Sequence, residues 1–227
     1  MARHGKKYNK VAEQAPAEVL ELEQAIGFLK EHATATFNET MELVLRMGID
    51  PRKSENAIRG TVSLPHGTGK KVQILVFASG EAADAARAAG ADHVGYEDMI
   101  EKVKGGWTGF DVAISTPDAM KEVRKLGRVL GPRGLMPNPK TGTVTDDVAQ
   151  AVQASQAGRV EFRMDRQGCI AVPFGKVSFE VQPLLENARA ILSAVRHERP
   201  AAAKGEYIKS ASVSSTMGVG LKVNVKD

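Results

Sequence analysis

Apolar and polar positions recur with different periods along the chain, and each period predicts a different kind of element. Residues 17–32 carry apolar side chains at helical spacing directly after Pro16, which predicts a helix. Residues 36–47 alternate instead, which predicts a strand with one buried face and one face in water. The side chains expected to be buried are Val19, Leu22, Ile26 and Leu29 in the helix, and Met41, Leu43 and Leu45 in the strand.

A second pattern occupies residues 67–158, where strand-like and helix-like segments follow one another in turn. Such alternation is typical of a parallel sheet that is covered by helices. The expected strands are residues 72–78, 92–96 and 110–116. The expected helices are residues 81–91, 97–106, 118–130 and 145–158. The last helix should be capped by Thr145 or Asp146 and should end at Gly158.

An antiparallel-like pattern returns at residue 159. Two strand-like segments surround turn residues at Asp165–Gly168, which predicts a β-hairpin. An amphipathic helix and two alternating strands follow it. These segments are residues 159–165 and 169–175 for the hairpin, 179–200 for the helix, and 207–215 and 220–227 for the last strands. The apolar stripe of the helix consists of Leu184, Ala188, Ile191 and Val195.

The simplest architecture is therefore two domains, one of the α+β class and one of the α/β class. Residues 1–66 and 159–227 would form a single discontinuous α+β domain, into which residues 67–158 are inserted as a parallel α/β domain. The chain would cross between the domains twice. Both crossings contain glycine, which absorbs changes of backbone angle at small steric cost, so they predict a hinge. The glycines concerned are Gly67, Gly69 and Gly158.

Composition excludes several classes of protein. The longest strongly apolar run, residues 72–78, is far shorter than the roughly 20 residues that a membrane helix needs. No apolar stretch follows the basic N-terminus, so a secretory signal is not expected. The single cysteine, Cys169, cannot form a disulfide within the chain, which fits a reducing compartment such as the cytoplasm. Five scattered histidines with one cysteine do not supply a zinc site, and no cofactor or metal is expected.

Positive charge is clustered rather than spread. The formal net charge is +4, and the whole excess falls in residues 159–227, which carry eleven Lys and Arg against seven Asp and Glu. Clustered basic surface favours a polyanionic partner, although solvated surface charge is the alternative interpretation. Two further basic clusters are Arg3, Lys6, Lys7 and Lys10 near the start, and Lys121, Arg124, Lys125, Arg128, Arg133 and Lys140 in the middle.

Catalytic motifs do not fit the chain. The stretch HGTGKK at residues 66–71 lacks the first glycine and the final Ser or Thr of a phosphate-binding loop, and it precedes a strand rather than opening a helix. Neither a G-x-S-x-G nor an H-E-x-x-H motif occurs. Two alternatives to a nucleic-acid-binding protein nevertheless stay open at this point. They are a nucleotide-using α/β enzyme and a protein–protein scaffold.

Residues 127–144, GRVLGPRGLMPNPKTGTV, combine four glycines and three prolines with no acidic residue. Proline fixes φ and glycine frees it, so a defined but irregular loop is expected rather than helix or strand. Arg128, Arg133 and Lys140 make it basic. Two interpretations remain, which are a loop that approaches tRNA or another RNA, and a purely structural turn with solvated charge.

The same stretch resembles the signature of the ribosomal protein L1 family, the large-subunit stalk proteins. Further blocks that resemble the family are residues 37–54, 58–70, 157–179 and 215–224. They span nearly the whole chain in the family's order and spacing. The resemblance implies a split RNA-binding domain with an inserted Rossmann-like domain, and it implies no enzymatic activity.

The partners that the resemblance implies are all nucleic acids. They are the large-subunit ribosomal RNA at the mobile stalk, the exit-site tRNA whose release the stalk assists, and, in bacteria, the messenger of the protein's own operon, whose translation is repressed. The free protein would be a monomer that acts in the cytoplasm on the ribosome.

Carried over residue by residue, the resemblance implies two RNA-facing groups. One is Phe37, Thr40 and Glu42, and the other is Thr216, Met217 and Gly218. An aromatic ring or a thioether packs on bases or ribose, and Thr and Glu bond 2′-hydroxyls. Phosphate contacts are expected from Lys53, Arg59, Arg163 and Arg166. The chain departs from the family pattern at Thr36, where Lys is usual, at Ala57, and at Val219, where Pro is usual.

Overall fold

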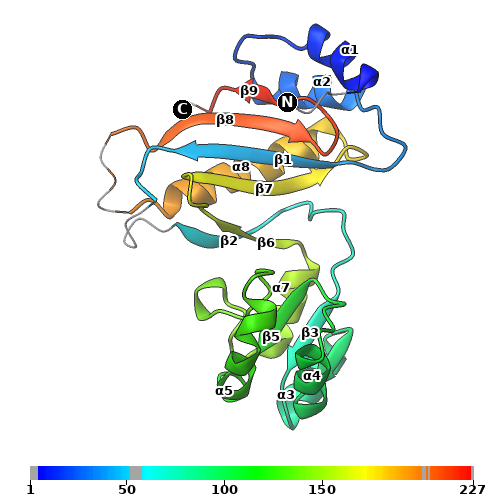
Figure 1. The fold of residues 1–227 in the computed structure, drawn as a ribbon, viewed down its shortest axis with the longest axis vertical. Helices are drawn as coiled ribbons and strands as arrows, with labels where there is room; N and C mark the ends of the chain where they lie inside the picture. Colours follow the sequence, from blue (N-terminus) through cyan, green and yellow to red (C-terminus); the bar gives the residue numbers. More distant parts are fainter. Residues whose placement is uncertain (1–4, 52–57, 201–202, 204, 226–227) are drawn as a thin grey trace. The chain divides into compact units, whose positions relative to one another are not determined.

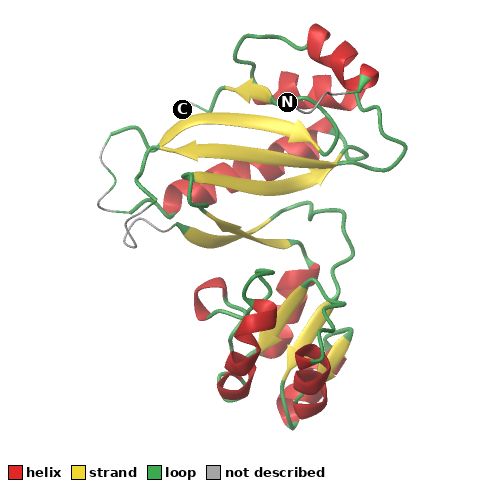
Figure 2. Ribbon diagram, viewed as in Figure 1, coloured by secondary structure: helices red, strands yellow, loops and turns green. Residues whose placement is uncertain are grey.

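The computed structural model describes residues 5–51, 58–200, 203 and 205–225, and these fall into two compact units. Unit 1 joins Met1–Gly69 with Val160–Asp227, and unit 2 is Lys70–Arg159. Unit 1 contains antiparallel sheets built from both ends of the chain, and unit 2 contains a parallel sheet with helices (Figures 1 and 2). The predicted mixture of α+β and inserted α/β structure is thereby confirmed.

The main sheet of unit 1 has the strand order β7-β1-β8-β9, with every pair antiparallel. β1 is a central strand, and both of its neighbours come from the C-terminal part of the chain. A second sheet pairs β2 with β6. The strands are β1 (Thr40–Met47), β2 (Arg59–Ser63), β6 (Arg159–Arg163), β7 (Cys169–Lys176), β8 (Ile208–Ser215) and β9 (Leu221–Val223).

One face of the main sheet carries the core of unit 1. The predicted alternation of β1 is confirmed, because Met41, Leu43 and Leu45 are completely buried while Glu42 and Arg46 are exposed. Helices α2 (Leu22–Glu31) and α8 (Val181–His197) pack on the buried face. All four residues of the predicted α8 stripe are fully buried. No helix of the described residues covers the other face of the sheet, which Figure 1 shows toward the viewer.

The start of the chain differs from its prediction. A short helix, α1 (Lys6–Gln14), precedes α2 and was not expected. Helix α2 begins at Leu22, because Leu20 instead forms a parallel bridge to Val223 of β9. The extended backbone at this bridge leaves Val19 62% exposed, so the prediction of Val19 as a core residue is wrong.

The predicted hairpin at residues 159–175 is wrong in its pairing. The turn exists, since the Asp165 carboxylate accepts hydrogen bonds from the backbone N–H groups of Gln167 and Cys169, each at 2.8 Å. The two strands that flank it enter different sheets, however, because β6 pairs with β2 and β7 pairs with β1. Alternation along a strand indicates its buried face but not its partner.

Unit 2 is a three-stranded parallel sheet of order β4-β3-β5 with helices on both faces. Leu75 and Phe77 of the central strand pack into one hydrophobic cluster, whereas Ile74 and Val76 pack into another. This two-sided burial explains the continuous apolar run in the sequence. The elements are β3 (Ile74–Phe77), β4 (His93–Gly95), β5 (Val112–Ser115), α3 (Glu81–Ala88), α4 (Glu97–Lys104) and α7 (Val148–Gln156).

Two details of unit 2 correct the sequence analysis. The helix predicted at residues 118–130 is divided into three short pieces, and one boundary lies at Gly127, a residue of low helix propensity. The pieces are α5 (Met120–Val123), the 3-10 turn η2 (Arg124–Leu126) and α6 (Gly127–Leu130). The cap of α7 is Asp147, whose carboxylate accepts from the N–H of Gln150 at 3.1 Å, rather than Thr145 or Asp146.

Residues 127–144 contain more regular structure than the irregular loop that was expected. They include α6 at one end and a second 3-10 turn, η3 (Pro139–Thr141), near the other. Asn138 caps η3 by accepting from the N–H of Lys140 at 2.9 Å. Val144 then bridges to Ser115 of β5, so the stretch returns to the edge of the sheet and closes the unit.

A buried amide fixes the end of unit 1 before the first crossing. The side chain of Asn187 on α8 is fully buried and makes three hydrogen bonds to the backbone. Its Nδ2 donates to the carbonyl oxygens of Gly67 at 2.9 Å and of Phe174 at 2.8 Å, and its Oδ1 accepts from the N–H of His66 at 3.1 Å. Residues 66–67 are therefore bound to α8.

Replacing Asn187 by Leu is expected to lower the free energy of unfolding by about 2–4 kcal/mol, because three backbone groups lose their only described side-chain partner and one of them, the carbonyl of Phe174, is buried. Chemical denaturation of the full chain measures this change. Gln182→Leu is the matched control, since Gln182 lies on the same helix with its side chain exposed. Equal effects of the two substitutions would contradict the assigned role of Asn187.

Candidate nucleic-acid interface

Two segments from opposite ends of the chain meet at one edge of the main sheet. The backbone N–H of Thr40 donates to Thr216 Oγ1 at 3.0 Å, and the backbone N–H of Thr216 donates to the carbonyl oxygen of Thr40 at 3.0 Å. These segments carry Phe37 and Met217, whose exposed fractions are 54% and 59%. The structure thus brings together the two groups of residues that the resemblance assigned to RNA.

The carboxylate of Glu39 holds both segments, and it is only 2% exposed. Its Oε2 accepts from the hydroxyl of Ser215 at 2.6 Å and from the backbone N–H of Met217 at 3.0 Å. Its Oε1 accepts from the backbone N–H of Ala35 at 3.3 Å. One buried side chain therefore positions the loop before β1 and the loop after β8. Sequence reasoning missed it, because all that the sequence shows is an acidic residue between Asn38 and Thr40.

Burial by itself would raise the pKa of the Glu39 carboxyl, because a buried charge loses its hydration. The hydrogen bonds from Ser215, Met217 and Ala35 oppose this effect by stabilising the charged form. Together they hold the pKa below its ordinary value. Glu39 is therefore a carboxylate at neutral pH and acts only as a hydrogen-bond acceptor.

A glycine is needed at position 218 for a structural reason that was not apparent from the sequence. A Cβ at this position would lie 2.3 Å from Ser215 Oγ, the same hydroxyl that donates to Glu39. The glycine is thus required by close packing inside the loop. The next residue, Val219, is 4% exposed and anchors the loop in the core of unit 1.

On the outer face of the main sheet, β7 and β8 contribute mainly small side chains, whereas β1 contributes larger ones. The registers place Glu42 between Pro173 and Ser214, and Arg46 between Cys169 and Ser210. Between these rows, Val44 lies between Ala171 and Ser212, and Ser212 also faces Lys222 of β9. The face therefore carries a row of serine hydroxyls beside the charged side chains of Glu42, Arg46 and Lys222. The alternating serines of residues 208–215 were the sequence signal for it, and sequence reasoning did not use them.

The predicted phosphate contacts lie in different settings. Arg163 and Arg166 are exposed and form no ion pair among the described residues. The turn that carries Arg166 lies beside the far end of β1, since the N–H of Met47 donates to the carbonyl of Gly168 at 2.8 Å. Arg59 is instead paired with Glu161, with Nε and Oε1 2.7 Å apart. Lys53 and Ala57 lie outside the described residues.

The candidate interface therefore extends along the whole of β1. Thr40 begins this strand and Met47 ends it, and its eight residues span roughly 25 Å at the usual rise of a β-strand. Phe37, Thr216 and Met217 lie at the first end, and the turn with Arg166 lies at the other.

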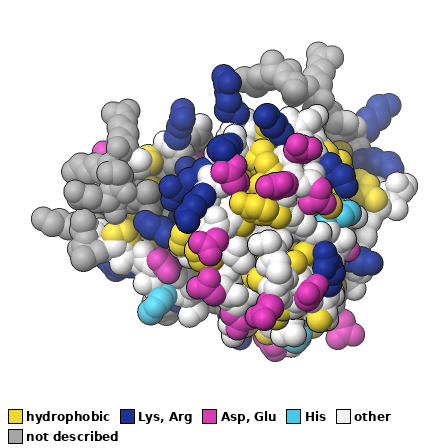
Figure 3. Space-filling view, turned by 90° about the horizontal axis from the view of Figure 1, so that it is seen from below, with side chains coloured by type: hydrophobic (Ala, Val, Ile, Leu, Met, Phe, Trp, Pro, Cys, Tyr) yellow, Lys and Arg dark blue, Asp and Glu magenta, His cyan; other side chains and the backbone are white. Residues whose placement is uncertain are grey.

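The basic residues of unit 2 form a separate group. Arg128, Arg133 and Lys140 are exposed, and Arg133 donates to the hydroxyl of Thr108. Ion pairs neutralise Lys121 through Asp118 and Lys125 through Glu122. Figure 3 shows one face on which many Lys and Arg side chains lie toward one side, while others lie among the Asp and Glu side chains elsewhere. The predicted approach of this group to RNA remains a prediction.

The three glycines at the crossings adopt positive φ angles, which are 63° at Gly67, 68° at Gly69 and 97° at Gly158. A Cβ at Gly69 would also lie 2.8 Å from the ring of Phe179. Gly69 is thus held in a conformation that other residues rarely adopt.

The described part of the chain gives little support for a metal site or a membrane-spanning helix. Its residues include no group of three or more His, Cys, Asp or Glu side chains that is able to hold a metal ion. Among the same residues, no helix has both the length and the apolar composition needed to cross a membrane.

The chain is similar to known proteins over most of its length. A model of the family described as "Ribosomal protein L1p/L10e family" matches residues 29–219. The large ribosomal subunit protein uL1 of Protochlamydia amoebophila (strain UWE25) is 50% identical over 228 residues, which cover 100% of this chain and 97% of that relative.

Glu39→Gln is expected to lower the free energy of unfolding by about 1–3 kcal/mol at pH 7, because an amide cannot accept all three hydrogen bonds. The lowered pKa means that the carboxylate stabilises the fold above its unfolded pKa of about 4.3, and that this stability is lost as the pH falls through the lower folded value. The gap between wild type and variant should therefore narrow on acidification.

Denaturant unfolding at several pH values between 7 and 3 measures that gap. Glu42→Gln is the control, because its exposed side chain on the same strand should change the free energy of unfolding by no more than about 0.5 kcal/mol. A gap that stays constant with pH would show that the charge of Glu39 is not what holds the two loops.

Proposed function

Because this chain belongs to the ribosomal protein L1p/L10e family, we propose that it binds large-subunit ribosomal RNA through the outer face of its main sheet and the two loops at the edge of that face. The family resemblance seen in the sequence is confirmed, and family membership makes the chain a ribosomal protein with a structural role rather than an enzyme.

The joined loops are the observation that carries this proposal. Among the described residues, the exposed large hydrophobic side chains are those of Val19, Phe37 and Met217, and two of these three lie together at the edge of the sheet. Exposed apolar groups that lie together mark interaction sites. A ring and a thioether suit the faces of bases and ribose, and the neighbouring Thr40 and Thr216 suit 2′-hydroxyls.

The outer face of the sheet supports the same function. Small side chains on β7 and β8 allow a nucleic acid to approach the backbone closely, and serine hydroxyls offer both donors and acceptors. Arg46, Lys222 and the turn with Arg166 supply positive charge around this face. Since RNA helices are recognised mainly by shape and by contacts to phosphate and 2′-hydroxyl groups, the face fits a structured RNA.

We further propose the finer role that the family resemblance implies. The RNA is the mobile stalk of the large subunit, and the protein assists release of tRNA from the exit site there, in the cytoplasm. The basic loop of unit 2 with Arg128, Arg133 and Lys140 would face RNA in this role. A similar RNA fold on the messenger of its own operon would allow the protein to repress translation.

Binding should separate into a salt-independent part and a salt-dependent part. Thr216→Val combined with Met217→Ala should weaken binding of a stalk RNA fragment at all salt concentrations without changing the slope of log K against log salt. Arg166→Ala should reduce that slope by roughly 0.7–0.9, which corresponds to one lost phosphate contact. Filter binding at several salt concentrations measures both quantities.

Arg59→Ala is the matched control for Arg166→Ala. Arg59 is already paired with Glu161, so its removal should change the slope less. Identical slope changes in the loop variant and in Arg166→Ala would show that the loops act only through general electrostatics. If none of the variants weakens RNA binding, the RNA site lies elsewhere on the protein.

The glycines at the two crossings lead to a second expectation, namely that the units change their relative orientation when RNA binds while each unit stays rigid. Neutron scattering of the full chain is measured without RNA and with bound RNA, in a solvent whose scattering matches that of the RNA. Each curve then reports on the protein alone. The two scattering curves should differ at low angle. Superimposable curves would reject Gly67, Gly69 and Gly158 as a hinge.

A further inference from the structure

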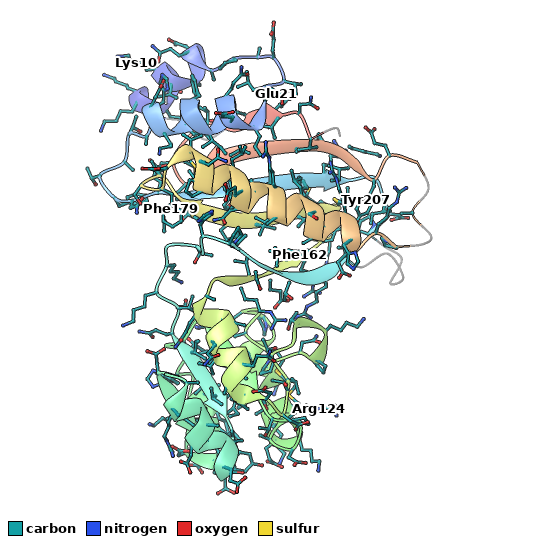
Figure 4. The ribbon with its side chains drawn as sticks, turned by 180° about the vertical axis from the view of Figure 1, so that it is seen from behind. Lys10, Glu21, Arg124, Phe162, Phe179 and Tyr207 are labelled. Carbon is teal, nitrogen blue, oxygen red and sulfur yellow. The ribbon has the colours of Figure 1, made fainter. Side chains whose placement is uncertain are left out.

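A hollow of about 370 Å³ lies beside the proposed RNA loops in unit 1. It is lined by Lys7 and Tyr8 of helix α1 with the preceding Gly5, by residues 34–37 of the loop before β1, and by Met217. Figure 4 shows α1, which is marked by Lys10. This helix lies outside the residues 29–219 that the family model matches.

The lining of the hollow suits a nucleobase. Phe37 presents an exposed aromatic ring and Met217 an exposed thioether, while the half-buried Tyr8 forms part of the wall. The hydroxyls of Thr34 and Thr36 form no hydrogen bond among the described residues, so they are available to the edge of a base. A volume of about 370 Å³ is at the lower end of the roughly 300–1,000 Å³ of small-ligand sites, which favours a single nucleotide over a larger group.

The charge around the hollow favours an anion. Helix α1 carries Lys6, Lys7 and Lys10 against the single acid Glu13, and all three lysines are exposed. None of the three forms an ion pair with a described residue, and no carboxylate lines the hollow. Lys7 is therefore able to contact a phosphate beside the base without competition from a carboxylate of the described residues.

We propose that this hollow receives one unpaired base of the bound RNA, stacked on Phe37, while Lys7 contacts the adjoining phosphate. The inference rests on the proposed RNA-binding function and extends the interface from the sheet onto α1. Phe37 and Met217 belong to both parts, so the same RNA is able to run from the sheet into the hollow.

The test uses the full chain and a large-subunit stalk RNA fragment in which one unpaired nucleotide at a time is made abasic. One abasic position should weaken binding to the wild type by about 10-fold, as expected for the loss of a stacked base. Phe37→Leu should weaken binding to the intact RNA and reduce the penalty of that abasic position. Phe37→Tyr, which keeps the ring, should behave like the wild type.

Lys7 and Lys10 provide a matched pair on one helix, because both are exposed and only Lys7 lines the hollow. Lys7→Ala should weaken binding at least about threefold more than Lys10→Ala, as expected if only Lys7 contacts a phosphate. Circular dichroism melting of every variant verifies that the fold is kept.

Two further outcomes separate this inference from the function on which it rests. If the wild type binds the stalk RNA more tightly than an unrelated RNA, but no abasic position matters and the two lysine variants are equal, the hollow takes no base and the proposed function stands. If the wild type does not distinguish the two RNAs, the proposed function and the inference are both wrong.

Discussion

The pairing of β1 with β7 and β8 is the constraint on which unit 1 depends. A strand from the N-terminal part of the chain, at residues 40–47, lies between two strands from the C-terminal part, at residues 169–176 and 208–215. Alternate residues of all three strands point into one core. The chain must therefore leave unit 1 before Lys70 and return to it after Arg159. The insertion of unit 2, the two crossings and the meeting of the two loops all follow from that pairing.

The same pairing leaves one face of the sheet open, and the candidate interface is built on it. The face itself needs only small side chains, whereas its edge needs loops of fixed shape. The buried carboxylate of Glu39 fixes the shape of these loops by accepting hydrogen bonds from Ser215, Met217 and Ala35. The buried charge thus does not contact RNA in this proposal, but it decides where Phe37 and Met217 lie.

Elements whose burial follows a local period were predictable from the sequence. The stripe of α8, the alternation of β1 and the apolar run of β3 all appear in the structure as expected. Features that depend on distant residues were not predictable. The partner of β6, the bridge that leaves Val19 exposed and the role of Glu39 all depend on contacts more than 90 residues away in sequence. The resemblance supplied Phe37 and Met217, which no period would indicate.

The position of β8 also sets the order in which the protein is completed during synthesis. Unit 2 is continuous, so it has all of its residues as soon as Arg159 has left the ribosome that makes it. The central strand β1 must wait for Ser215, about 170 residues later, before both of its neighbours exist. Contacts between such distant residues form slowly, because a long loop must close first. The proposed RNA-binding face can therefore be completed only after unit 2 has all of its residues, because a chain that has not yet reached β8 lacks one of the strands of that face.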